Sequence, residues 1–76
     1  MSKIKKQQVI NAKVGDIVTF NRKYIAHEGV VYQVREKSVL VNISKDSQTY
    51  LGYENRNTVV SHMNYTILLN HNVVNE

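Results

Sequence analysis

The chain has 76 residues, of which 42% are hydrophobic, and it carries a formal net charge of +4 and no cysteine. This length allows one small domain with a thin core, and the lack of cysteine excludes disulfides, thiolate metal sites and a thiol nucleophile. No window approaches the ~18 apolar residues of a membrane span, and polar residues interrupt the start of the chain, where an export signal would be apolar. We therefore expect a soluble, cytoplasmic protein with no membrane partner.

The amino-terminal segment, residues 1–13, is basic. It contains Lys3, Lys5, Lys6 and Lys13 and no acidic residue, whereas six basic and six acidic side chains follow from residue 14 onward. We expect a flexible basic arm on a neutral body. Such an arm either holds a polyanion or serves only as a solubilising end.

From residue 14 onward, apolar residues recur with a period of two, which predicts β-strands rather than amphipathic helices. Val14, Val18 and Phe20 share one side of the first strand, and the later strands alternate in the same way. The five expected strands lie within Val14–Phe20, His27–Val34, Val39–Ile43, Thr58–Tyr65 with a short turn at His62–Asn64, and Tyr65–Leu69.

The segments between these strands are polar and short, as expected of turns. Gly15 and Asp16 form a turn that feeds the first strand, and Arg35–Ser38 forms a hairpin. The widest gap, Ser44–Asn57, is either a loop or an extended hairpin arm. We further expect a longer loop at Asn21–His27 and a tail over residues 70–76.

Gly29 stands directly before a run of β-branched and aromatic residues, although glycine weakens a strand. In a small barrel the second strand must bend sharply, and a Cβ at the bend would collide with a neighbouring strand. We therefore expect a bulge near this glycine, with Val31 and Val34 pointing inward on either side of a change in alternation.

Five short strands with closely spaced turns favour a small closed barrel over a sandwich. Closure also removes the exposed strand edges that promote aggregation. The predicted fold is all-β, a small five-stranded SH3-like barrel over residues 14–69.

Three stretches carry a family resemblance: "VGDIVTF", "HEGVVYQV" and "SVLVNI". Together they resemble the KOW pattern of SH3-like barrels. The chain from Val14 to about Leu69 is similar to the YkvS-like proteins of Gram-positive bacteria, a small uncharacterised domain family whose ending resembles "TVVSHMNYTI". The resemblance implies a KOW-like barrel, and KOW-type modules have RNA, DNA, ribosomal surfaces and RNA polymerase as partners.

No motif indicates catalysis, a cofactor or a metal site. The histidines His27, His62 and His71 form no HExxH or close His/carboxylate spacing, and the serines lack a nucleophile-elbow context. We expect His62 to bond a nearby carbonyl and hold its turn. The residues to which we assign a structural role are Gly15, Asp16, Gly29 and His62.

Arg22, Lys23 and Tyr24 form the candidate binding site. An aromatic ring offers a base a surface for stacking, and cationic groups neutralise phosphates. The alternative is that Tyr24 lies over the open end of the barrel. Tyr50, Tyr53 and Arg56 would extend this surface, or Tyr50, Leu51 and Tyr53 would form a lid over the core.

The sequence thus leads to a non-enzymatic binding module that contacts nucleic acid, or a machine such as the ribosome or RNA polymerase, through Arg22, Lys23, Tyr24, Arg56 and the arm lysines Lys3, Lys5 and Lys6. A second hypothesis is a protein-interaction module or homodimer, formed through the tyrosines and an exposed face with Val30, Tyr32 and Leu40. A third is a phage-type or accessory protein that inhibits or sequesters a host factor or an anionic nucleotide.

Overall fold

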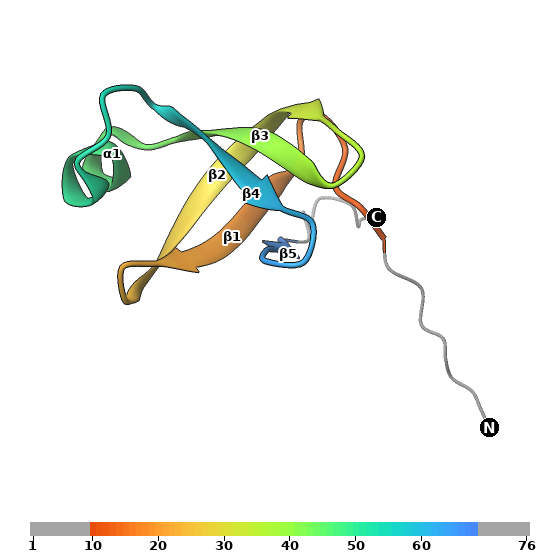
Figure 1. Ribbon diagram of the computed structural model, residues 1–76, viewed down its shortest axis with the longest axis horizontal. Helices are drawn as coiled ribbons and strands as arrows, with labels where there is room; N and C mark the ends of the chain where they lie inside the picture. The colour runs from red at the N-terminus through yellow and green to blue at the C-terminus, as the bar shows by residue number, and fades with distance from the viewer. Residues whose placement is uncertain (1–9, 69–76) are drawn as a thin grey trace, which may run out of the picture.

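Five strands and one short helix follow one another along residues 10–68, the part of the chain that the computed structural model describes (Figure 1). The strands form one antiparallel sheet in the order β4-β3-β2-β1-β5, which curls around a small core and so confirms the predicted all-β, barrel-like class. The elements are β1 (Ile17–Arg22), β2 (Ile25–Val34), β3 (Ser38–Ile43), α1 (Lys45–Leu51), β4 (Asn57–Ser61) and β5 (Thr66–Ile67).

The long strand β2 joins the two halves of the sheet. Its first part, Ile25–Val30, pairs with β1, and its second part, from Gly29 onward, pairs with β3. Gly29 lies in the overlap. A Cβ on Gly29 would lie 2.7 Å from Val41 Cγ2 and 2.8 Å from Val41 Cβ. Because Val41 is fully buried, the sheet can curl this tightly only where β2 has no side chain.

A β-bulge follows Gly29, as expected. The register between β2 and β3 shifts between Val31 and Gln33, which leaves Tyr32 as the extra residue. Val34 pairs with the buried Val39 and therefore shares its side of the sheet. Val34 thus points to the inner side, as expected, although it lies at the end of the sheet and is 41% exposed.

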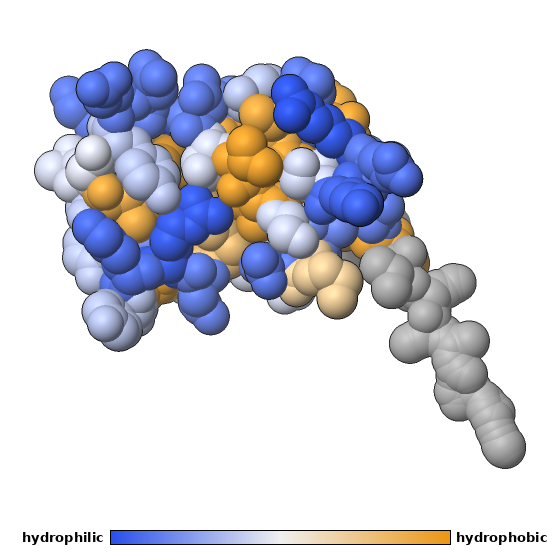
Figure 2. Space-filling model, viewed as in Figure 1, coloured by the Kyte–Doolittle hydropathy of each residue, from blue (hydrophilic) through white to orange (hydrophobic). Residues whose placement is uncertain are grey.

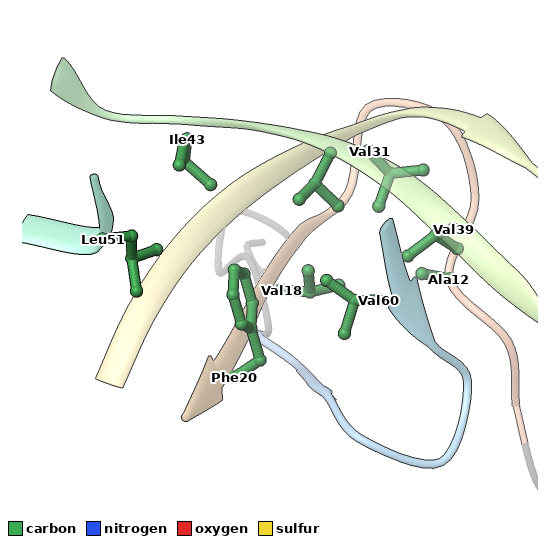
Figure 3. Close-up of a cluster of buried hydrophobic side chains, with 9 residues drawn as sticks. Ala12, Val18, Phe20, Val31, Val39, Ile43, Leu51 and Val60 are labelled. Atoms are coloured by element: carbon green, nitrogen blue, oxygen red, sulfur yellow. The ribbon is translucent and has the colours of Figure 1, made fainter. Parts of the chain in front are cut away.

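The core fills the concave side of the sheet (Figure 3). Every second residue of β3 contributes to it, as the alternation predicted. Leu51 of α1 and Ala12 close two sides of the core, and Ala12 donates its backbone N–H to Tyr65 Oη at 2.9 Å. The packed chain therefore begins before residue 14. The buried apolar residues are Ala12, Val18, Phe20, Val31, Val39, Val41, Ile43, Leu51 and Val60.

Three predicted segments differ in the structure. The expected loop at Asn21–His27 is a tight hairpin, since β1 continues to Arg22 and β2 begins at Ile25. The segment Ser44–Asn57, expected as a loop or hairpin arm, contains α1. Val14, expected on the same side as Val18, lies in the turn before β1 and is exposed.

Some predicted features lie outside the described residues, namely the lysines Lys3, Lys5 and Lys6, Leu69 of the fifth strand and the tail 70–76. Over residues 10–68, no helix is long and apolar enough to cross a membrane.

Candidate functional site

The turn between β1 and β2 has an unusual backbone. Arg22 and Ile25 are the last paired residues, so Lys23 and Tyr24 alone make the connection. Both have a positive φ, 53° at Lys23 and 77° at Tyr24. Two-residue hairpin turns with positive φ at both positions favour Asn-Gly, because an L side chain with a Cβ is strained there. This turn instead carries a lysine and a tyrosine.

The turn projects its side chains into solvent. Tyr24 is 101% exposed, so no residue of the described part of the chain covers its ring. Lys23 is also exposed. Of the two alternatives for Tyr24, a stacking surface or a lid over the barrel end, the lid is therefore wrong.

Helix α1 supports the turn from one side. Ser44 caps its first turn by accepting a bond from the Ser47 N–H, and Gly52 ends the helix in the left-handed conformation. The hydroxyl of Tyr50 in this helix donates to the Lys23 carbonyl at 2.7 Å. The turn and the helix lie at the same end of the molecule (Figure 1).

His27 anchors the helix to the hairpin. Its ring is 2% exposed and lies between Phe20 and Tyr50, with ring centroids 5.9 and 5.7 Å away. Its Nε2 lies 3.0 Å from the Arg22 carbonyl oxygen, which can only accept. In the neutral ring, Nδ1 therefore accepts from the Ser47 hydroxyl at 2.8 Å. A buried ring with both nitrogens bonded acts here as a structural link.

The guanidinium of Arg22 faces the protein rather than the solvent around the turn. It donates to Tyr53 Oη at 3.1 Å, to Thr58 Oγ1 at 2.9 Å and to the Val59 carbonyl at 3.2 Å. It also lies 5.0 Å from the centre of the Phe20 ring. These contacts tie the end of β1 to β4, and they separate Arg22 from Lys23 and Tyr24.

The other predicted residues of this surface are divided in the same way. Tyr53 is half-buried against the core, as a lid would be, whereas Tyr50 is partly exposed beside the turn. Arg56 is an exposed residue, but its Nε donates to the Ile43 carbonyl at 3.0 Å. It lines the groove described below, and Tyr24 does not line that groove.

The residues with predicted structural roles make local contacts. Gly15 has φ 96°, and its N–H donates to the Val31 carbonyl, while Asp16 Oδ2 accepts from the Lys13 N–H at 2.8 Å. His62 Nε2 lies 2.8 Å from the carbonyl oxygen of Arg35, the kind of contact expected for it. Its Nδ1 lies 2.7 Å from Tyr65 Oη.

The convex side of the sheet presents exposed apolar side chains, which we call the outer face: Ile17, Val30, Tyr32, Leu40 and Val59. Ile17 pairs with Val30 and Leu40 pairs with Val59. Across β2 and β3, Val30 pairs with Asn42 and Leu40 pairs with Gln33, so polar residues lie among the apolar ones. Figure 2 shows an apolar patch over β3 and β4 on this side. A groove of about 290 Å³ adjoins it, lined in part by Val30, Glu28 and Arg56.

A second hollow lies beside the hairpin, between β1 and the turn that follows β4. It measures about 280 Å³ and is lined in part by Thr19, Asn21, Asn64 and Thr66, which are neutral and polar. Within residues 10–68, no cluster of three or more His, Asp or Glu side chains could hold a metal ion.

Together these features define a small all-β domain, a curled five-stranded sheet with an aromatic turn at one end. Residues 10–68 match the model of a family described as "Uncharacterized protein conserved in bacteria (DUF2187)". The match covers most of the chain, which belongs to this family. No curated protein and no solved structure matched the chain.

Proposed function

We propose that this protein is a binding module that holds single-stranded nucleic acid at the β1–β2 turn. Tyr24 supplies a ring on which a base stacks, and Lys23 contacts a phosphate. The observation that carries the proposal is a strained turn that presents a fully exposed aromatic ring. For L-residues the left-handed conformation costs roughly 1–2 kcal/mol each. Strain that the fold does not need is common at functional sites.

The surroundings of the turn support this assignment. Base stacking on an aromatic ring contributes about 1–3 kcal/mol per base and tolerates any sequence. The polar hollow beside β1 is lined by Asn21, which is two residues before Lys23, and by Asn64. The side-chain amides of these two residues can bond the edge of a neighbouring base. The lysines Lys3, Lys5 and Lys6 would add contacts to phosphates.

The resemblance to YkvS-like and KOW-type domains supports the same proposal, since KOW-type modules include nucleic-acid binders. The strand order β4-β3-β2-β1-β5 is compatible with an SH3-like barrel. Arg22 is left out of the proposed contacts because its guanidinium already bonds to β4. Arg56 is left out because it lines the groove beside Val30, whose lining does not include Lys23 or Tyr24.

The test is the affinity of the full chain for fluorescently labelled single-stranded RNA and DNA, measured by anisotropy. Tyr24→Ala should raise Kd about 5- to 150-fold, the equivalent of one stacked base, whereas Tyr24→Phe should bind like the parent. Lys23→Gln should lower the slope of log K against log salt by about 0.7, and Lys37→Gln, in the β2–β3 turn, should leave it unchanged. Equal affinities for the parent and Tyr24→Ala would refute the proposal.

A second variant separates binding from folding. Replacing Lys23 by Asn and Tyr24 by Gly supplies the residues that this turn prefers. The doubly substituted chain should melt at a higher temperature than the parent and bind oligonucleotides more weakly. If the doubly substituted chain melted at a lower temperature than the parent and bound oligonucleotides equally tightly, the strain in the turn would not serve ligand binding.

A further inference from the structure

The outer face is a feature of the described molecule that the proposed function leaves unused. Four strands contribute apolar side chains to it, with Ile17 on β1, Val30 and Tyr32 on β2, Leu40 on β3 and Val59 on β4. All except Leu40 are more than a third exposed, and Leu40 is partly exposed between them. Isolated apolar residues are normal on a surface, whereas several gathered on one face of a sheet are typical of an interaction site.

Two opposite charges lie at one end of this face. Glu28 and Arg56 both line the groove beside Val30. Glu28 is on β2 and Arg56 directly precedes β4, so β3 lies between them. Both residues are exposed, and the Nε of Arg56 donates to the Ile43 carbonyl. The face therefore carries one charge of each sign at this end, on opposite sides of β3.

We propose that the outer face binds a second copy of this chain in a two-fold symmetric dimer. Strands β2 and β4 flank β3, so a two-fold axis parallel to β3 places β2 of one copy over β4 of the other. This arrangement brings Glu28 of each copy over Arg56 of the other, which gives two symmetric ion pairs. It also places Tyr32 over Val59 and brings the two Leu40 side chains together at the axis.

The charge pattern is what favours a second copy over another partner. A face with both charges on one side of β3 would need a partner of different sequence, whereas this one complements itself under a two-fold rotation. Chains of fewer than about 80 residues commonly gain stability from a partner subunit, which agrees with a core of nine buried apolar side chains within residues 10–68. The β1–β2 turn lies outside the outer face, so this inference does not depend on the proposed function.

The first experiment measures the mass of the full chain by size exclusion with light scattering over a range of concentrations. The parent should reach twice the chain mass. Leu40→Glu should remain a monomer, and Met63→Glu, which adds the same charge at an exposed apolar residue outside the face, should dimerise like the parent. A parent that stays monomeric at every concentration would overturn the proposal and leave the face to a different partner.

The second experiment tests the geometry. Glu28→Arg should weaken the dimer, and adding Arg56→Glu should restore it, with melting curves confirming that each variant folds. Because the chain has no cysteine, Asn42→Cys on β3 can be joined by a short bis-maleimide, and it should cross-link faster than Lys37→Cys in the β2–β3 turn. A dimer with no charge rescue and equal cross-linking rates would place the interface elsewhere and overturn the assignment.

Discussion

At the scale of single residues, Gly29 decides whether the sheet can curl. In a strand, replacing glycine by alanine normally stabilises a protein by about 0.4–1 kcal/mol, because it restricts the unfolded chain. Here the new Cβ would lie 2.8 Å from Val41 Cβ and 3.2 Å from the Asn42 carbonyl oxygen. Overpacking of this kind costs typically 1–3 kcal/mol. Gly29→Ala should therefore lower the free energy of unfolding, by about 0.5–2 kcal/mol.

Denaturant unfolding of the two chains measures this difference. Gly52→Ala is the informative comparison, since a Cβ on Gly52 meets no atom within 4 Å but the residue has φ 75°. It should be destabilised by backbone strain alone. A Gly29→Ala variant as stable as its parent would mean that β2 passes from β1 to β3 with more room than the structure shows.

Residues whose role depends on their immediate neighbours could be predicted from the sequence. Gly29 interrupts a run of strand-forming residues, and His62 lies in a polar turn, so each pattern indicated a local structural role. The contacts of Arg22 could not be predicted in this way, because Tyr53 and Thr58 lie 31 and 36 residues further along the chain. Its position beside Lys23 and Tyr24 suggested one binding trio, whereas the fold directs its guanidinium to β4.

At the scale of elements, α1 and the β1–β2 hairpin depend on each other through His27. Ser47→Ala removes the hydroxyl that bonds His27 Nδ1 and leaves a buried polar atom without that partner. Such a loss costs about 1–3 kcal/mol. The variant should unfold at a lower denaturant concentration, and the hydrogen-bonded amide protons of Gln48 and Gly52 should exchange faster as the helix loosens.

The matched control is Thr49→Ala, which changes an exposed residue of the same helix and should shift stability by no more than about 0.5 kcal/mol. If Ser47→Ala and Thr49→Ala proved equally stable, the bond between Ser47 and His27 would not hold the helix in place.

The helix and the tight hairpin were the elements that sequence patterns missed. Helix α1 has only seven residues, too few to show a helical period. Its signal was in the caps, since Ser44 and Gly52 bracket it as an N-cap and a left-handed C-terminal glycine. The hairpin had no such signal. Neither Lys23 nor Tyr24 is a residue that this turn prefers, and this mismatch is the reason for assigning the turn a function.

At the scale of the whole molecule, the all-β class followed from alternation in the segments that form β1, β3 and β5. The way the sheet closes did not. Strands β4 and β5 are the two edges of the sheet, and side chains bridge the opening between them. At one end, Arg22 joins β1 to β4. At the other end, His62 contacts the Arg35 carbonyl and the Tyr65 hydroxyl. The same Tyr65 hydroxyl accepts from the Ala12 N–H. Such contacts between distant segments leave no mark in a local pattern.

The structure also determines where the basic arm can be cut. Ala12 is buried and bonded to Tyr65, and the family match begins at residue 10, so a deletion of residues 1–9 spares the packed domain. It removes Lys3, Lys5 and Lys6. Melting should therefore change little. If the three lysines contact phosphates, the slope of log K against log salt for a single strand should fall by about 2, since each contact contributes about 0.7.

A variant that keeps residues 1–9 but has glutamine in place of Lys3, Lys5 and Lys6 separates the effect of charge from the effect of chain length. If the lysines neutralise phosphates, this variant and the deletion should have the same slope of log K against log salt, because the uncharged part of the segment does not change that slope. An unaltered slope in both variants would restrict the nucleic-acid contact to the β1–β2 turn. Lowered affinity with an unaltered slope would instead mean that residues 1–9 act through uncharged contacts, and the electrostatic role of the arm would have to be abandoned.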